Sequence, residues 1–440
     1  MIVSIVARFQ GHGEREVDRY AAWQSALQRL RDDWQAARQS EIWQLENYLP
    51  DVPESQRAGA MEDLVAEHLR LTWQAGVGRP LEQYFESLRD SFPALASAET
   101  IPATLVEDEF LARYQSPHGD TPTLPEFRRR FPGRADVFAL LGHRFLAAGR
   151  YVLLHKLGLG EMGEVWRAYD TQLRREVAVK RPRAAHISNG ESRRRFAAEA
   201  ALTAGLEHPG IASVHEFHEG AEPFYVMRLV NGRPFGERIR DYHQAPADQS
   251  RKDRRLQRHQ LLNSFVAVCD AVAFAHARGI IHRDLKPGNV VAGDHGDTVI
   301  LDWGMAKRFA DAEPDARPIV GTPEYMPPEQ ADGNADTRSD VFGLGAILFE
   351  LLTTRFPQPW PEGSRPADWR RMVREARIPH PSQLKADTPR ALEAICLKAL
   401  AHSPADRYQS ADELAREVRS YLAGEPVTAL ARSFWSRWRG

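Results

Sequence analysis

One stretch of eight residues combines side chains that could carry out a group transfer. It reads His282-Arg283-Asp284-Leu285-Lys286-Pro287-Gly288-Asn289. Asp284 could act as a general base between two cations, and the amide of Asn289 could bind a hard metal ion. Thirteen residues later, Asp302 follows the apolar run 299–301. Each acid also has an ordinary structural alternative, Asp284 as a helix cap and Asp302 as a turn residue.

A glycine-rich segment precedes this stretch. Gly158, Gly160 and Gly163 fit the spacing G-x-G-x-x-G, which alone is a weak signal of phosphate binding. In a dinucleotide-binding fold the motif opens a helix, but residues 164–169 are of the β type. We therefore predict a loop between two strands, whose backbone N–H groups can close over phosphates. The sequence contains no G-x-x-x-x-G-K-[ST], which excludes a Walker-type NTPase.

A lysine and a glutamate between these two motifs could form a pair. Lys180 ends the apolar run 177–179, so its ammonium is expected to point inward, where it needs an anion. Either a phosphate or a carboxylate would serve. Glu199 is the single acid among small apolar residues of a predicted helix at 196–202, and it is the candidate partner.

Together and in this order, the motifs resemble those of the protein kinase family, specifically the bacterial eukaryotic-like (Hanks-type) serine/threonine kinases. The resemblance covers about residues 148–424. It implies an α+β, bilobal fold, with a β-rich N-lobe at 148–228 and a helical C-lobe at 229–424. It also implies ATP and Mg²⁺ as cofactors, and transfer of the γ-phosphoryl group to Ser and Thr hydroxyls of protein substrates, in signalling.

The resemblance implies a catalytic role for Asp284, Lys286 and Asn289, and a metal-binding role for Asn289 and Asp302. Asp284 corresponds to the catalytic base, and Lys286 to the residue that steadies the transferred phosphoryl group. Asn289 and Asp302 correspond to the magnesium ligands. Lys286, two residues after the base, fits serine/threonine kinases, since tyrosine kinases usually have Ala-Ala-Arg there.

The resemblance also implies a nucleotide site. Lys180 matches the lysine that holds the α- and β-phosphates, and Glu199 matches its ion-pair partner. In the hinge-like segment 224–230, Met227 would be the gatekeeper, with backbone groups of two following residues at the adenine edge. The expected cofactor-binding residues are Leu157, Gly158, Gly160, Gly163, Val165, Ala178, Lys180, Glu199, Met227, Arg228, Val230, Val291 and Asp302.

Further matches lie downstream. Residues 321–329 resemble the segment that docks the substrate, Asp340 resembles the residue that anchors the catalytic loop, and Arg407 would pair with Glu329. A surface ion pair at that place would contribute little, whereas the family's pair is buried. Trp303 and Pro327 replace the usual Phe and Ala, and both changes leave the expected ligands intact.

The segment 305–320 contains no Ser, Thr or Tyr. Kinases with an Arg before the catalytic Asp usually need a phosphate in this segment to pair with that Arg. We hypothesise that Asp311, Glu313 or Asp315 replaces the phosphate opposite Arg283. The alternative is a solvated acidic loop.

Residues 1–147 are predicted to form an all-α interaction or regulatory region. One stripe of apolar side chains has the spacing of a helix face, and it could form a homodimer seam or cover the region's own core. It consists of Tyr20, Trp23, Leu27, Leu30, Trp34 and Ala37. A helix–loop–helix pattern that ends in Phe-Pro occurs at residues 67–93 and again at 108–132, which suggests an internal duplication.

Composition excludes several classes of protein. The 440 residues carry 58 Lys and Arg against 60 Asp and Glu, so no general attraction to nucleic acid is expected. Only two cysteines are present, Cys269 and Cys396, which excludes a disulfide framework. No apolar run is long enough for a membrane span, and the N-terminus is a poor signal peptide. We therefore expect a cytoplasmic protein.

Two basic segments have open interpretations. Residues 251–258 form a basic run before a helix, which is either a solvated face or a docking site for an acidic partner or phosphopeptide. Residues 425–440 form a basic and aromatic C-terminal tail, for which contact with a membrane surface is an alternative that we do not favour.

Three functions fit these motifs. The leading hypothesis is an active protein serine/threonine kinase. A pseudokinase scaffold would be favoured by loss of Lys180, Asp284, Asn289 or Asp302, and all four are present. A small-molecule kinase with the same fold is disfavoured by the complete peptide-docking segment at 321–329.

Overall fold

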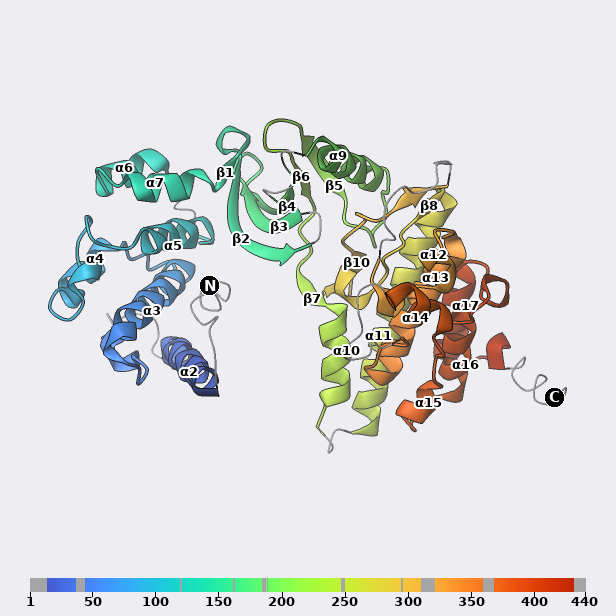
Figure 1. Ribbon diagram of the computed structural model, residues 1–440. Coiled ribbons are helices and arrows are strands. Elements are labelled where there is room, and N and C mark those ends of the chain that lie inside the picture. The colour runs from blue at the N-terminus through green and yellow to red at the C-terminus, as the bar shows by residue number, and fades with distance from the viewer. Residues whose placement is uncertain are drawn as a thin grey trace. The chain divides into compact units, whose positions relative to one another are not determined.

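The computed structural model describes residues 14–36, 44–118, 121–160, 163–183, 187, 189–246, 250–293, 296–309, 321–358 and 368–430. The chain divides into two compact units. The first comprises Met1–Leu154 and Ala168–Arg175, and the second comprises His155–Arg167 and Glu176–Gly440. Figure 1 labels the elements of both units.

The first unit is mainly helical. Its helices are α2 (Glu14–Ala36), α3 (Glu54–Gln74), α4 (Glu82–Leu88), α5 (Ala103–Tyr114), α6 (Leu124–Arg130) and α7 (Ala135–Gly142), with 3-10 turns η1 (Leu45–Tyr48), η2 (Pro93–Leu95) and η3 (Ala147–Gly149). From the predicted stripe on α2, Trp23, Leu27 and Leu30 belong to the unit's own core. The stripe therefore covers its own domain. The side chain of Tyr20 and all of Ala37 lie outside the described residues. A homodimer through the N-terminal helices stays a prediction.

The repeated helix–loop–helix pattern is present in the first unit. Helices α3 and α4 form one copy, and α5 and α6 form the other. Phe92 and Phe131, which close the copies, are both buried. Glu109 of α5 links the copies, because its carboxylate accepts hydrogen bonds from the backbone N–H of Leu81 (2.9 Å) and from Arg130 (2.6 Å).

A six-stranded sheet follows, with strand order β1-β2-β3-β4-β6-β5, in which the pairs β1–β2, β4–β6 and β5–β6 are antiparallel. Its strands are β1 (Phe145–Leu146), β2 (Tyr151–Leu159), β3 (Gly163–Asp170), β4 (Arg175–Pro182), β5 (Val214–His218) and β6 (Phe224–Met227), and helix α9 (Gly190–Ala204) lies between β4 and β5 in the sequence. The predicted hairpin is thus confirmed as β3 and β4. The glycine motif lies in the loop between β2 and β3, as predicted, rather than at the start of a helix.

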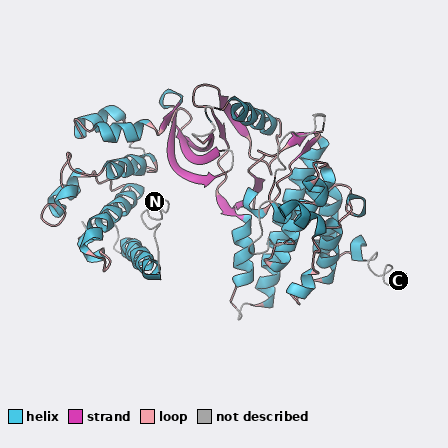
Figure 2. Cartoon of the chain, viewed as in Figure 1, coloured by secondary structure: helices cyan, strands magenta, loops and turns pink. Residues whose placement is uncertain are grey.

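The rest of the second unit is mostly helical, as Figure 2 shows in cyan. The helices are α10 (Phe235–Gln244), α11 (Arg251–Ala277), α12 (Pro328–Ala331), α13 (Thr337–Thr353), α14 (Trp369–Glu375), α15 (Pro381–Leu384), α16 (Arg390–Ala399) and α17 (Ala411–Ala423). Two small sheets accompany them, one of β7 (Gly232–Pro234), β9 (Val290–Gly293) and β10 (Thr298–Ile300), the other of β8 (Ile280–Ile281) and β11 (Lys307–Arg308). Short 3-10 turns are η4 (Pro287–Asn289), η5 (Pro323–Tyr325) and η7 (Pro404–Asp406).

Helix α11 is long and apolar enough to cross a membrane by length and composition alone, since one 18-residue window has a mean hydropathy of 1.3. Half of that window is buried within the protein. Phe265, Cys269 and Val272 lie in the largest hydrophobic core of the second unit. This is the pattern of a helix at the centre of a globular fold.

The sheet and the helices that follow it confirm the expected α+β class. The helical N-terminal region expected before the sheet is also present. The domain boundaries predicted at residues 147, 228 and 424 stay predictions. The division into compact units falls within β2, within β3 and after the first residue of β4. In the predicted C-terminal tail, Val427 and Ala429 are buried, and Glu417 accepts the backbone N–H of Ala429 (2.9 Å). Residues 431–440 lie outside the described part of the chain.

Candidate active site

Lys180 is held at the end of β4 by two carboxylates. Its neighbour across the sheet is Tyr225 of β6. The Lys180 ammonium is almost fully buried and donates to Glu199 Oε1 (2.5 Å) and to Asp302 Oδ1 (3.1 Å). Burial lowers the pKa of Lys180, but the surrounding groups outweigh it and hold that pKa well above its ordinary value. Lys180 therefore stays a cation, and the predicted pair with Glu199 is confirmed.

Glu199 has a second donor, which the sequence interpretation missed. The hydroxyl of Tyr225 donates to Glu199 Oε1 (2.7 Å). The Tyr225 ring is fully buried and lies 5.2 Å from the ring of Phe196, which also belongs to α9. The available signal was the period of a strand, since Tyr225 stands two residues before Met227 and so faces the same side of β6.

The loop that follows β8 is fixed by Asp340 of α13. This buried carboxylate accepts the backbone N–H groups of His282 and Arg283, both at 2.8 Å, and it also contacts His276 Nε2 at 2.8 Å. Burial raises the pKa of Asp340, yet these hydrogen bonds and the nearby imidazoles bring it below its ordinary value. The expectation that Asp340 anchors this loop is confirmed.

The two other predicted catalytic side chains, those of Lys286 and Asn289, converge on Asp284, and Thr322 joins them. Lys286 Nζ lies 2.8 Å from Asp284 Oδ2. Asn289 Nδ2 donates to the carbonyl oxygen of Asp284 (2.8 Å) and to its Oδ2 (3.1 Å). Thr322 donates to Asp284 Oδ1 through its backbone N–H (3.0 Å) and its hydroxyl (2.8 Å), and Lys286 donates to the same hydroxyl (2.7 Å). Only a position in the docking segment was predicted for Thr322.

The residues expected to bind magnesium suit that ion. Asn289 uses its Nδ2 on Asp284, which leaves its amide oxygen as an acceptor. Asp302 Oδ1 accepts from Lys180 and from the backbone N–H of Gly304, and 43% of its side chain is exposed. Among the described residues no group of three His, Cys, Asp or Glu could enclose a metal. An amide and a carboxylate oxygen match Mg²⁺, which usually binds one or two carboxylates together with substrate phosphates.

The glycine loop is built by close backbone contacts. Gly160 N–H donates to the carbonyl oxygen of Gly163 (2.8 Å). A Cβ on Gly163 would lie 2.5 Å from the carbonyl oxygen of Arg181, so no larger residue fits there. A Cβ on Gly160 would lie 4.0 Å from Asp302 Oδ2, which places this loop over the candidate metal ligand. Residues 161–162 lie outside the described part of the chain.

Most of the residues expected around the adenine share one apolar cluster. Ala178 and Met227 form part of it, with Val165 and Val230 packed against it. The N–H of Arg228 donates to Ser213 (2.9 Å), so its carbonyl is the group left for a ligand. The other two expected residues lie apart from this cluster: Leu157 on β2, with 48% of its surface exposed, and Val291 on β9.

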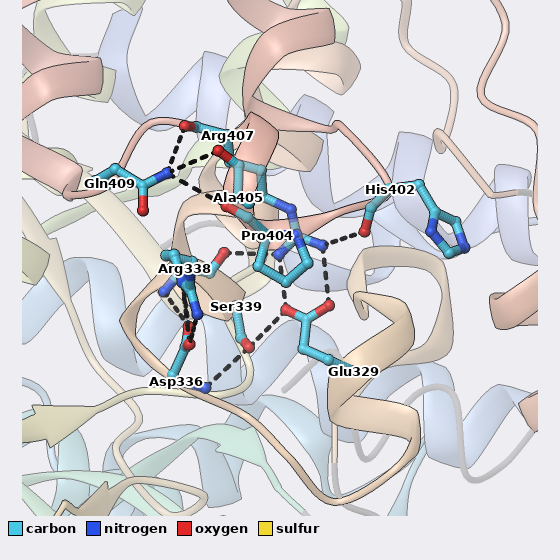
Figure 3. Close-up of polar contacts among 9 residues, drawn as sticks. All are labelled: Glu329, Asp336, Arg338, Ser339, His402, Pro404, Ala405, Arg407 and Gln409. Atoms are coloured by element: carbon cyan, nitrogen blue, oxygen red, sulfur yellow. Dashed lines mark hydrogen bonds and ion pairs between the residues drawn. The ribbon is translucent and has the colours of Figure 1, made fainter.

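Glu329 and Arg407 form a buried pair (Figure 3). The Arg407 side chain has no exposed surface, and its two terminal nitrogens donate to the two Glu329 oxygens at 2.7 and 2.9 Å. Ser339 also donates to Glu329 Oε1 (2.7 Å), and carbonyl oxygens of Ala401 and His402 accept from Arg407. The expected pair is confirmed, and it is buried rather than on the surface.

The acidic residues proposed to replace a phosphate, Asp311, Glu313 and Asp315, lie outside the described residues. Arg283 itself is buried, and its Nε donates to the carbonyl oxygen of Met305 (2.7 Å). The hypothesis about the acidic loop therefore stays a prediction.

Comparison with known proteins gives consistent matches. The sequence profile of the protein kinase domain matches residues 151–418. Serine/threonine-protein kinase PknD of Chlamydia pneumoniae is 32% identical over 315 residues, which cover 66% of this chain and 33% of that protein. The probable serine/threonine-protein kinase SCO3848 of Streptomyces coelicolor is 36% identical over 292 residues, which cover 64% and 41%. Among solved structures, the PknI kinase domain of Mycobacterium tuberculosis has 27% identity and a TM-score of 0.47, covering 62% of this chain and 96% of that one. The chain thus spans well under half the length of these two curated relatives.

Proposed function

The chain belongs to the protein kinase family, and on that premise we propose that it is an active serine/threonine protein kinase. It would transfer the γ-phosphoryl group of ATP to Ser or Thr hydroxyls of proteins. The observation that supports this is the complete and mutually bonded set around Asp284 and Lys180. Lys286 and Asn289 contact Asp284, while Glu199 contacts Lys180. A pseudokinase would be expected to lack at least one of these groups.

Each side chain has a task that its geometry allows. Lys180, held by Glu199, binds the phosphates of ATP. Asp284 Oδ1, which now accepts from Thr322, orients the substrate hydroxyl and accepts its proton. Lys286 steadies the transferred group from its position beside Asp284. The glycine loop excludes water from the site.

Mg²⁺ would be held by the amide oxygen of Asn289 and the carboxylate of Asp302. The metal, when bound, neutralises charge on the phosphates. The finer assignments follow from the same proposal: adenine against Ala178 and Met227, with backbone groups of Arg228 and Val230 at its edge.

Partners and location belong to the proposal as well. Family membership implies protein substrates. The balanced charge supports the absence of a nucleic-acid partner, and two free buried thiols, Cys269 and Cys396, support a cytoplasmic location. A homodimer through the N-terminal helices and membrane contact of the tail are secondary proposals, and the buried stripe on α2 weakens the first.

The test is phosphate incorporation from γ-labelled ATP with Mg²⁺, using casein and the chain itself as acceptors. Asp284→Asn should reduce the rate by about 100- to 10,000-fold, the range typical of a general base. Chelation of Mg²⁺ should abolish transfer by the wild type. Equal incorporation by the wild type and Asp284→Asn would contradict the proposed function.

A further inference from the structure

A surface pocket in the helical part of the second unit lies outside the candidate active site. It is a shallow hollow that opens to solvent. Its walls are the end of α10, the beginning of α11, the end of α13 and the segment after α15. The lining residues include His243, Arg254, Arg258, Lys385 and Asp387. None of them belongs to the predicted site residues.

The pocket carries an excess of positive charge. Arg254, Arg258 and Lys385 bring three cations, and Asp387 is the one carboxylate among the lining residues. Asp387 Oδ2 lies 3.8 Å from Arg254 Nη2, and both side chains are more than a third exposed, so this pair is weak. Within the described part of the chain, the side chains of Arg258 and Lys385 form neither an ion pair nor a hydrogen bond. The net charge of the pocket is therefore +2 with His243 neutral.

Several nitrogens in the pocket are shielded from water without a partner among the described residues. They are Nε of Arg254, Nε of Arg258 and Nδ1 of His243. Such groups usually have a hydrogen-bond partner, and each exception calls for an explanation such as an absent ion. His243 Nε2 donates to the carbonyl oxygen of Leu351 (2.9 Å), because a carbonyl cannot donate. Burial lowers the pKa of His243 and keeps its ring neutral, so Nδ1 is an acceptor, and the donors available to an anion are those of Arg254, Arg258 and Lys385.

We propose that this pocket binds a phosphate monoester dianion, presented by a phosphoserine or phosphothreonine side chain of a protein. A dianion balances the net charge of +2, whereas a single carboxylate would leave one cation uncompensated. Two guanidinium groups supply the planar donors that suit phosphate oxygens. The basic run at 251–258 thus includes a binding site on the side of α11 that bears Arg254 and Arg258, which are four residues apart and share a helix face. The choice of a phosphorylated protein as the source rests on the proposed function, since a protein kinase makes that group.

The test is fluorescence anisotropy of labelled peptides with degenerate sequence around a central phosphothreonine, added to the full chain. The phosphorylated peptides should bind about tenfold to a hundredfold more tightly than the same peptides with threonine, as expected for charge-assisted hydrogen bonds. Arg258→Ala and Lys385→Ala should each remove most of that difference. Arg255→Ala is the matched control, because Arg255 lies on the same helix, is exposed and does not line the pocket; it should leave the affinity unchanged.

Further variants separate this site from the active site. Asp284→Asn and Lys180→Ala should bind the phosphopeptides like the wild type, so a failure of the proposed activity would leave this result intact. If Lys180→Ala removes binding and Arg258→Ala does not, the phosphate occupies the active site and the proposal is wrong. Equal losses of phosphopeptide affinity in Arg255→Ala and Arg258→Ala would mean that the peptide is held by general charge attraction. That result would also overturn the proposal. If inorganic phosphate competes at the same concentration as the peptide, the proposed protein source is wrong.

Discussion

At the scale of single residues, the candidate active site depends on the position of one carboxylate. Glu199 Oε1 receives both the Lys180 ammonium and the Tyr225 hydroxyl. An ammonium alone leaves a glutamate free to rotate, but a second donor from a neighbouring strand restricts it. The tyrosine therefore links β6 to α9 beside Lys180, the residue that would bind phosphates in the proposed function.

Replacing Tyr225 with Phe removes this hydroxyl without changing the ring. We expect kcat/KM for peptide phosphorylation to fall about tenfold, because a hydrogen bond to a charged group contributes about 1.5–3 kcal/mol. Steady-state kinetics at varied ATP concentration measure this change in kcat/KM. Tyr408→Phe is the control, since Tyr408 donates to Glu417 (3.3 Å) outside the candidate site and its loss should leave kcat/KM unchanged. Equal kinetics for the wild type and Tyr225→Phe would refute this role.

At the scale of elements, the buried pair between Arg407 and Glu329 joins α12 to the segment before α17. Three backbone carbonyls, those of Arg338, Ala401 and His402, complete the hydrogen bonds of the guanidinium. The pair therefore connects the segment expected to dock substrate with α13 and with the segment before α17.

We expect Arg407→Ala to lower the free energy of unfolding of the second unit by about 3–5 kcal/mol, because it leaves a buried carboxylate without its cation. Urea denaturation followed by tryptophan fluorescence measures the change. Arg416→Ala removes an exposed pair with Asp412 and should change the value by less than about 1 kcal/mol. Similar effects of the two variants would show that burial of the pair does not matter.

At the scale of the whole molecule, the stability of the helical unit should depend on pH through His68. This side chain is buried, its Nδ1 lies 2.8 Å from the Tyr84 hydroxyl, and the Trp34 ring packs edge-on against it at 5.2 Å. Burial, with a smaller effect of Arg79, lowers the pKa of His68 to about 4. The unfolded chain then binds a proton at a higher pH than the folded chain does.

Stability should consequently fall as pH drops below the ordinary histidine value of about 6.5, by about 2 kcal/mol at pH 5. The loss ends near the folded pKa of about 4. Thermal unfolding between pH 7.5 and 5 measures the slope, which should be flatter in His68→Gln. His143→Gln, at an exposed position, should keep the wild-type slope. A wild-type slope in His68→Gln would rule out this source of pH dependence.

The boundary between the parts of the chain gives a second prediction at this scale. Val152 and Leu154 of β2 are buried in the core of the first unit. A chain that starts at residue 148 would expose both side chains, at a cost of about 1.5–3 kcal/mol each. We expect this truncated chain to be less stable and to aggregate, and light scattering and thermal unfolding measure both. A truncated chain as stable and monodisperse as the full one would mean that the helices contribute nothing to β2.

The sequence by itself predicted the chemistry and the kind of elements. Residue type and short spacing place Asp284, Lys286 and Asn289 on one loop, and the β-type residues after Gly163 exclude a helix there. Alternation and helical periods likewise predicted the hairpin of β3 and β4 and the stripe on α2. These features are local, so a few neighbouring residues carry the whole signal.

Only the tertiary structure decided which distant groups meet. Tyr225 reaches Glu199 across 26 residues, Thr322 reaches Asp284 across 38, and Arg407 reaches Glu329 across 78. No short pattern encodes such pairs, because they depend on how strands and helices pack. Packing also turned the stripe on α2 toward its own core and brought Lys385 and Arg258 to the same pocket. Burial, which sets the strength of an ion pair and the direction of a pKa shift, exists only once the chain has folded.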